Sequence, residues 1–180
     1  IWKEVGTKCI NLPQAHEIIK LVRLLTDSLE ENIILVTETN VPSQENLEYF
    51  GNGNEAHIIY NFSLPPLILH ALLTGESKWL RHWMMGMPPS SRNCTYLNFT
   101  ASHDGIGLRP LEGILPQLEI ESIVRTVQKF GGRLTFRKHF GKDIPYEINS
   151  TFYDALKGTT RGVDKLQSKR FIASQMIMIA

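Results

Sequence analysis

Short apolar runs that alternate with helical segments constrain the fold of this chain more than any other feature. The first run, Ile33-Ile34-Leu35-Val36-Thr37, is continuous and rich in β-branched residues, as expected for a strand that is buried on both faces. Strands are predicted at residues 33–37, 56–60 and 95–100. Helices are predicted from the spacing of apolar residues at 12–27, 65–73, 78–84 and 119–130. This alternation is typical of an α/β fold with a parallel sheet.

Polar residues follow each predicted strand. Glu38 comes after the first strand, Asn61 after the second, and His103 with Asp104 after the third. In a (β/α)8 barrel the C-terminal ends of the strands form the active-site face. A complete barrel typically has about 250 residues, whereas this chain has 180. We therefore expect residues 1–180 to form one domain, a partial (β/α)8 TIM barrel.

The segments outside this alternation carry further predictions. A polar loop rich in Pro, Gly and Asn is expected over residues 40–54. Residues 133–139 and 146–149 look like the two sides of an irregular hairpin around Gly141-Lys142, and residues 161–180 look like a final helix. The chain starts without Met and stops inside that apolar helical pattern, so we expect it to be truncated at both ends.

The charge balance and the cysteine count narrow the classes of partner and compartment. The net charge is +1, which removes the usual argument for binding nucleic acid or an anionic membrane surface. No apolar run reaches the roughly 18 residues that a membrane span requires. Cys9 and Cys94 are too few for a disulfide-stapled secreted domain, and we interpret both as free thiols. We expect a cytoplasmic protein that binds neither nucleic acid nor membranes.

Five motifs occur in order along the chain. They are Trp2-Lys3-Glu4-Val5-Gly6-Thr7, Thr37-Glu38-Thr39-Asn40, Tyr60-Asn61-Phe62-Ser63-Leu64-Pro65-Pro66, the stretch from Phe99 to Gly113, and Pro145-Tyr146-Glu147-Ile148-Asn149-Ser150-Thr151. In this register they resemble the α-amylase superfamily (glycoside hydrolase family thirteen), and more closely its sucrose phosphorylase branch. The second, third and fourth motifs look like the fifth, sixth and seventh strands of that family's barrel. The resemblance covers essentially the whole chain.

The resemblance implies a retaining transfer of glucose with Glu38 as the general acid/base. Such a reaction needs a carboxylic acid that protonates the leaving oxygen and later acts as a base, and burial in a pocket would raise the pKa of this group. Asp104 would be a further catalytic carboxylate that holds the donor sugar and stabilises the transition state, and His103 would bind the same sugar. From the residues alone, Glu38 could equally be a solvated loop glutamate, and His103-Asp104-Gly105 a turn. These ligands are too few to argue for a metal, and no cofactor is expected.

The resemblance also assigns the loop with Tyr146 and Glu147 to the acceptor or to phosphate. Sucrose phosphorylases tend to have Gln at the position of Glu147, so its carboxylate hints at the glucosylglycerate phosphorylase relatives. A carboxylate would repel an anion unless a cation such as Arg137 lies close, or it would accept hydrogen bonds from acceptor hydroxyls. Arg109 is expected near a phosphate subsite, or else it holds its own loop through Glu112. Glu147 could also be an exposed hairpin residue without a role in binding.

A tryptophan and methionine cluster has two interpretations. Trp79, Trp83, Met84, Met85 and Met87 could form a platform on which a sugar stacks, but their helical spacing favours packing in the core.

The expected function is that of a piece of an α-glucoside phosphorylase, which uses an α-glucoside donor and inorganic phosphate. The family's nucleophilic aspartate belongs before Ile1, so we expect residues 1–180 alone to be inactive. The alternatives are an α-glucosidase or transglucosidase of the same superfamily, and a sugar-binding barrel without catalysis. Sheet edges and apolar helix faces cut from a barrel would be exposed, so we also expect self-association of the fragment.

Overall fold

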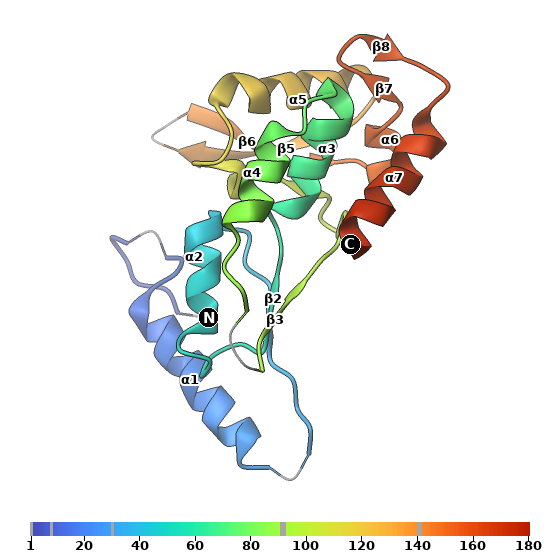
Figure 1. Cartoon of the computed structure of the whole chain (residues 1–180). Helices are drawn as coiled ribbons and strands as arrows, with labels where there is room; N and C mark the ends of the chain where they lie inside the picture. Colours follow the sequence, from blue (N-terminus) through green and yellow to red (C-terminus); the bar gives the residue numbers. More distant parts are fainter. Residues whose placement is uncertain (1, 8, 30, 91–92, 140–141) are drawn as a thin grey trace. The chain divides into compact units, whose positions relative to one another are not determined.

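The chain forms two compact units, each of which is described by itself. The computed structural model describes residues 2–7, 9–29, 31–90, 93–139 and 142–180 (Figure 1). The first unit comprises Ile1–Thr39, Gln44–Tyr60 and Pro89–Leu97. The second unit comprises Asn40–Ser43, Asn61–Pro88 and Asn98–Ala180.

A parallel sheet lies in the first unit, as predicted. Its strands are β1 (Val36–Thr37), β2 (Ile58–Tyr60) and β3 (Thr95–Leu97), in the order β1-β2-β3. All three are shorter than expected, and the prediction that the first strand is buried on both faces is wrong for this chain. Ile59 is fully buried, whereas the Ile34 side chain is 60% exposed. Among the described residues, a hydrophobic cluster that includes Ile19, Tyr49 and Phe50 packs against Ile59 of the sheet.

The helix α1 (Pro13–Asp27) agrees with its prediction, and Pro13 occupies the first turn, where its missing N–H costs nothing. Ala15, Ile19 and Arg23 recur every four residues on its buried face. Arg23 satisfies its charge there, because its guanidinium donates to the Asp27 carboxylate at 2.9 Å and to the Glu55 carbonyl oxygen at 3.0 Å. Salt-bridged and hydrogen-bonded in this way, an arginine can be buried beside the sheet.

The predicted loop over residues 40–54 is only partly irregular. It contains the helix α2 (Ser43–Leu47) and the 3-10 turn η1 (Glu48–Phe50). Tyr49 and Phe50 of this segment are buried, and burial of their rings stabilises a short helical segment that intrinsic propensity would not.

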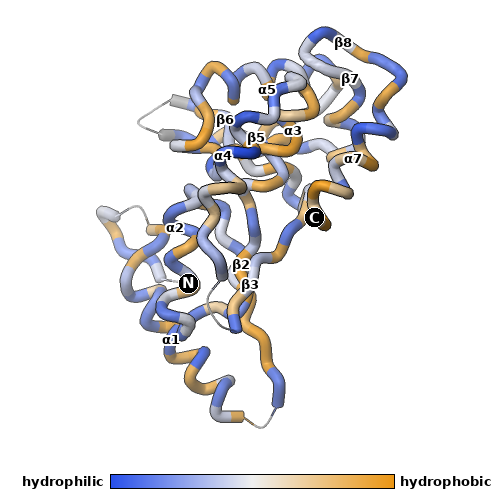
Figure 2. The backbone as a smooth tube through the Cα atoms, in the orientation of Figure 1, coloured by the Kyte–Doolittle hydropathy of each residue, from blue (hydrophilic) through white to orange (hydrophobic). Residues whose placement is uncertain are grey.

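The helix α3 (Leu64–Thr74) is the centre of the second unit. Its residues are buried on nearly all sides, and Figure 2 colours it as strongly hydrophobic. Three helices pack against it, namely α4 (Lys78–Gly86), α5 (Gln117–Lys129) and α7 (Gln167–Ile179). Its predicted bounds differ from the observed ones by a single residue at each end. A helix that is apolar all round is typical of a buried core element.

A small antiparallel sheet completes the second unit. Its strands are β4 (Ile106–Gly107), β5 (Arg133–His139) and β6 (Lys142–Asn149), in the order β4-β6-β5. The hairpin of β5 and β6 confirms the prediction, while the turn expected around Gly141 lies outside the described residues. The strand β4, which pairs with β6, was not predicted because two residues carry no periodic signal.

The prediction of one helix over residues 161–180 is wrong in its first part. A short helix α6 (Phe152–Ala155) and a ribbon of β7 (Gly158–Thr159) and β8 (Gly162–Val163) precede α7. Gly162 has φ +133°, which no helix accommodates, so the final helix begins only at Gln167.

Many apolar side chains are exposed in both units. They include Leu21, Leu24 and Leu25 on α1, and Ile172, Met176 and Ile179 on α7. Such surface favours association, and self-association of residues 1–180 stays a prediction. Among the described residues, the helices are too short or too polar to cross a membrane.

A hydrogen-bonded contact between His70 and Glu119 joins α3 to α5 and gives a prediction for stability. The fully buried His70 contacts Glu119 through Nε2, at 2.8 Å, and its Nδ1 has no hydrogen-bond partner among the described residues. We expect Glu119→Ala to lower the free energy of unfolding by about 1–3 kcal/mol, because it leaves the imidazole N–H buried without an acceptor. Urea unfolding measures this. Glu121→Ala, which removes an exposed pair with Arg125, is the control and should change the stability by less than about 0.5 kcal/mol; equal losses would contradict the prediction.

Candidate functional site

Glu38 lies immediately after β1 in the first unit, at the C-terminal end of the strand as predicted. Hydrogen bonds through Asn46 of α2 join the ends of two strands next to it. The Thr39 hydroxyl donates to Asn46 Oδ1 at 2.8 Å, and Asn46 Nδ2 donates to the Tyr60 carbonyl oxygen at 2.8 Å. This brace fixes the backbone that carries Glu38. The Glu38 side chain itself is exposed in this chain, not partly buried as expected.

His103 and Asp104 lie in the second unit, at the tip of a tight turn. Ser102 and Gly105 bridge across the turn, and Asn149 Nδ2 donates to the Asp104 carbonyl oxygen at 3.0 Å. The two side chains form a local pair, with 3.4 Å between His103 Nε2 and Asp104 Oδ1, and they are 80% and 59% exposed. Asn149 of β6 therefore holds the backbone of the turn, while the side chains of His103 and Asp104 are exposed.

Gly105 makes this turn sterically possible. Its φ is +107°, and a Cβ there would lie 3.1 Å from the carbonyl carbon of Ile148 and closer still to its oxygen. An L-residue would have to move the strand β6 or abandon the turn.

We expect Gly105→Ala to lower the free energy of unfolding by about 2 kcal/mol or more, since backbone strain and a backbone clash add. Thermal unfolding measures this loss. Gly86→Ala is the matched control, because a Cβ at Gly86 meets nothing within 4 Å and its φ is not positive. A Gly105→Ala variant as stable as Gly86→Ala would contradict the requirement for glycine in this turn.

Tyr146 and Glu147 are consecutive residues of β6. Burial raises the pKa of the Glu147 carboxyl, the hydrogen bond from Asn40 lowers it, and the negative charge of Asp104 raises it. Burial and the charge of Glu147 also raise the pKa of the Tyr146 hydroxyl. Glu147 is therefore half-buried and close to Asp104, unlike the exposed hairpin glutamate that was one of its interpretations.

Two arginines act on Tyr146. The Arg137 guanidinium lies 5.5 Å from the centre of the Tyr146 ring, and the charges of both Arg137 and Arg109 lower the pKa of its hydroxyl against the effect of burial. Arg109 also pairs with Glu112, with 3.7 Å between Nε and Oε1, as one of its two interpretations requires. Tyr146 thus lies near two arginines and also near the carboxylates of Glu147 and Asp104, and Glu147 lies beside the negative charge of Asp104.

Asn40, which belongs to the motif Thr37-Glu38-Thr39-Asn40, contacts the residues of β6. Its Nδ2 donates to Glu147 Oε1 at 3.0 Å, although the two residues are 107 positions apart. No periodicity or spacing in the sequence signals such a contact. The second unit therefore brings together Asn40, Asp104, Tyr146, Glu147 and Arg137, while Glu38 belongs to the first unit.

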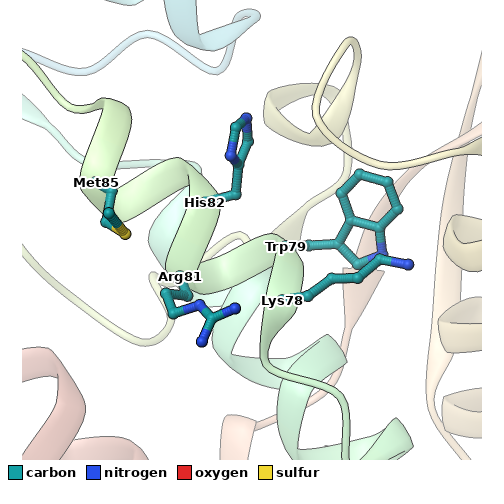
Figure 3. A pocket seen from close by; sticks show the side chains of 5 residues that line it. All are labelled: Lys78, Trp79, Arg81, His82 and Met85. Atoms are coloured by element: carbon teal, nitrogen blue, oxygen red, sulfur yellow. The ribbon is translucent and has the colours of Figure 1, made fainter.

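A hollow lies on α4, and none of these residues is among those that line it. It has a volume of about 650 Å³ and is lined by Lys78, Trp79, Arg81, His82 and Met85 (Figure 3). Trp79 and Trp83 pack against the core of the second unit, whereas Met85 is exposed. This arrangement agrees with core packing of the tryptophans, while Trp79 and Met85 line the same hollow, so the platform interpretation stays open for these two residues.

The whole chain aligns with known proteins. No family model matches. The glucosylglycerate phosphorylases of Allomeiothermus silvanus and Escherichia coli are 42% and 43% identical over 182 aligned positions, covering 100% of this chain but only 33% and 32% of the relatives. The crystal structure of sucrose 6F-phosphate phosphorylase from Thermoanaerobacter thermosaccharolyticum matches with a TM-score of 0.77 at 22% identity, over 98% of this chain and 34% of that one, which supports the mixed α/β fold.

These relatives are glycosyl phosphorylases, and the motifs around Glu38 and Asp104 fall within the aligned length. The chain spans about a third of the length of the curated relatives it matches. It therefore belongs to the α-amylase superfamily (glycoside hydrolase family thirteen), in the branch of the glucosylglycerate and sucrose phosphorylases.

Proposed function

We propose that this chain supplies the acid/base and a transition-state carboxylate of a retaining α-glucoside phosphorylase, which transfers glucose to phosphate. The observation that carries the proposal is the sequence identity of 42% and 43% with two glucosylglycerate phosphorylases over the whole chain. In this proposal β1, β2 and β3 are the fifth, sixth and seventh strands of the barrel. Their parallel order and the polar residues at their C-terminal ends support that assignment.

The chemistry assigns each carboxylate a separate task. In the first step a nucleophilic carboxylate attacks C1 of the glucosyl group while Glu38 donates its proton to the leaving oxygen, and a covalent glucosyl ester forms. In the second step a phosphate oxygen attacks C1, the phosphate proton passes to the Glu38 carboxylate, and the ester bond breaks, which releases α-glucose 1-phosphate and restores both carboxyl groups. Asp104 stabilises the positive charge that develops on the sugar ring in both steps, and His103 donates a hydrogen bond to the same sugar.

The second unit offers neighbouring groups that suit an anion and hydroxyl groups. Tyr146, with Arg137 and Arg109 nearby, suits phosphate, because cations and a hydroxyl donor stabilise an anion. Glu147 suits the hydroxyl groups of an acceptor, because a carboxylate accepts hydrogen bonds and repels phosphate.

Phosphate dependence tests the function. The complete enzyme that carries these residues should consume an α-glucoside and release glucose 1-phosphate only when phosphate is present. Release of glucose independent of phosphate would identify an α-glucosidase or transglucosidase, and binding without consumption would identify a sugar-binding barrel. The family's nucleophile motif has no counterpart in residues 1–180, so this polypeptide alone should show no turnover, and phosphorolysis by it would contradict the assignment of the nucleophile.

Substitution of Glu147 tests whether this residue binds the hydroxyl groups of the acceptor and not phosphate. In the complete enzyme, we expect Glu147→Gln to raise KM for a hydroxylated acceptor by roughly 5- to 30-fold, since a charge-assisted hydrogen bond is replaced by a weaker one. KM for phosphate should stay the same or fall. Initial rates in both directions measure this. Asp143→Gln, an exposed exchange on the same strand, is the control, and an unchanged acceptor preference in Glu147→Gln would contradict the assignment.

A further inference from the structure

Hydrogen-bonded side chains tie α1 to the segment around η1 in the first unit. His16 of α1 contacts Glu55 Oε2 through Nδ1 at 2.6 Å, and Asn11 Oδ1 through Nε2 at 2.8 Å. Asn11 Nδ2 in turn donates to Glu48 Oε2 of η1 at 2.7 Å. The His16 and Glu55 side chains are only 14% and 3% exposed, so water competes little for the contact between them. None of these residues belongs to the candidate site.

These contacts fix the number of protons that the side chains carry. The ionised carboxylate of Glu48 can only accept hydrogen bonds, so the Asn11 NH2 group faces Glu48 and the Asn11 carbonyl oxygen faces His16. His16 Nε2 must therefore carry a hydrogen. Nδ1 can then form its hydrogen bond with Glu55 only if the imidazole or the carboxyl holds one further proton. The His16–Glu55 pair thus shares one proton more than a neutral imidazole beside an ionised carboxylate.

The surroundings of the pair favour this protonated form. The His16 ring lies on the buried ring of Tyr49, with 4.6 Å between the ring centres and 30° between the planes, and an aromatic face attracts a positive charge. Asn11 has φ +53°, a left-handed conformation that persists where the surrounding contacts hold it. The hydrogen bonds of Asn11 to His16 and Glu48 are such contacts.

The other described groups that face the pair keep their charge near neutral pH. Burial raises the pKa of the Tyr49 hydroxyl, and so do the neighbouring carboxylates of Glu55, Glu45 and Glu48. A hydrogen bond with Glu17 raises the pKa of Lys20, whose Nζ lies 3.9 Å from Glu55 Oε1. Arg23 donates to the Glu55 carbonyl oxygen at 3.0 Å, and a guanidinium stays protonated. A change of charge at this place therefore belongs to the pair itself.

We propose that the His16–Glu55 pair is a pH-sensitive clamp between α1 and η1. While the pair holds its proton, His16 binds Asn11 and Glu55 together. When the proton leaves, an imidazole lone pair faces a buried carboxylate, and the contact opens. An unfolded chain releases an imidazole proton at about pH 6.5, so a proton that the folded chain keeps above this pH stabilises the fold, and this stabilisation is lost as the pH rises further.

Opening of the clamp affects the backbone next to Glu38. The helix α2 continues directly into η1, and it carries Asn46, which braces the strand ends beside Glu38. Loosening of η1 therefore loosens the segment that holds this brace. His16 and Glu55 are in this way positioning residues for Glu38. This step rests on the proposed function, whereas the clamp itself does not.

Removal of the imidazole tests the clamp. In the complete enzyme, His16→Gln breaks the clamp at every pH, because an amide carries its hydrogens on one nitrogen and cannot donate to both Glu55 and Asn11. Its thermal unfolding midpoint should lie about 2–4 °C below that of the wild type at about pH 6, and the difference should shrink at about pH 9, where the wild type has lost the proton. His82→Gln, at an exposed histidine of α4, is the matched control and should have the wild-type midpoint at both pH values.

Glu55→Gln separates a proton-dependent clamp from ordinary packing. The new amide can donate to His16 Nδ1 while Nε2 donates to Asn11, so the contacts form with a neutral imidazole. The Glu55→Gln midpoint should therefore exceed the wild-type midpoint at the higher pH and not at the lower one. If His16→Gln and Glu55→Gln each changed the midpoint by the same amount at both pH values, the pair would only pack, and the inference would be overturned.

The rate of the complete enzyme tests the link to Glu38. The ratio of kcat in Glu55→Gln to kcat in the wild type should rise by roughly twofold or more over the same pH range, because a displaced catalytic group slows the reaction. A constant ratio together with the expected midpoints would refute the link to Glu38 and support the clamp. Release of glucose that does not depend on phosphate would refute the proposed function, and the unfolding midpoints would still decide whether the clamp exists.

Discussion

Replacing Glu38 with glutamine should lower kcat/KM for phosphorolysis of an α-glucoside with a poor leaving group by about 10²- to 10⁴-fold, the usual contribution of a general acid/base. Glutamine has nearly the same shape but cannot donate a proton to the leaving oxygen. The exchange should leave the fold intact, because the brace of Thr39, Asn46 and Tyr60 near Glu38 does not use its side chain. Initial rates of glucose 1-phosphate release in the complete enzyme measure the loss.

An activated donor separates acid catalysis from other causes of lost activity. A glucosyl donor with a fluoride or nitrophenolate leaving group departs without protonation, so Glu38→Gln should lose less than about tenfold in the formation of the glucosyl intermediate. Glu31→Gln, an exposed glutamate ahead of the same strand, is the matched control and should behave as the wild type with both donors. If Glu38→Gln lost as much activity with the activated donor as with the poor one, Glu38 would not be the acid.

Asp104→Asn should cost about 10³-fold in kcat/KM, because it removes a charge that stabilises the developing positive charge on the sugar. In contrast to Glu38→Gln, the loss should be similar with the activated donor, since leaving-group protonation is not what is removed. The structural contacts of Asp104 with Ser102 and Asn149 use its backbone, so the free energy of unfolding should change by less than about 0.5 kcal/mol.

Two measurements on Asp104→Asn are therefore needed together, the rate with both donors and the unfolding midpoint. Asp143→Asn, an exposed aspartate on β6 of the same unit, is the matched control for the loss of one negative charge. An Asp104→Asn enzyme with the activity of Asp143→Asn would show that His103-Asp104-Gly105 is only a turn.

The parallel strands and most helices were predictable because their signal is local. Apolar residues at helical spacing placed α1, α3 and α5 within a few residues of their observed bounds, and the run that ends at Thr37 placed β1 in a parallel sheet. The final helix was predicted too long because the apolar pattern hid the effect of Gly162, whose backbone conformation ends any helix.

The candidate site was predictable only in part, because some of its contacts join residues that are far apart in the sequence. Glu38, His103 and Asp104 follow predicted strands in the sequence, but position alone left their roles open, and the resemblance to a known family assigned them. The pairing of Asn40 with Glu147 joins residues far apart, and it depends on the space above Gly107, which no sequence pattern reveals. The burial of the first strand also differs from the sequence-based expectation. Ile34 and Val36 were expected to be buried, as in the sheet of a complete α/β fold, but both side chains are exposed in this chain.

The configuration of the first product tests retaining phosphorolysis most directly. The complete enzyme is supplied with an α-glucoside and phosphate, and proton NMR records the anomeric signals before mutarotation or secondary reactions occur. Two successive displacements at C1, with Glu38 as acid and then base, predict α-glucose 1-phosphate as the first product. β-Glucose 1-phosphate, or glucose formed at a rate indifferent to phosphate, would contradict the proposal.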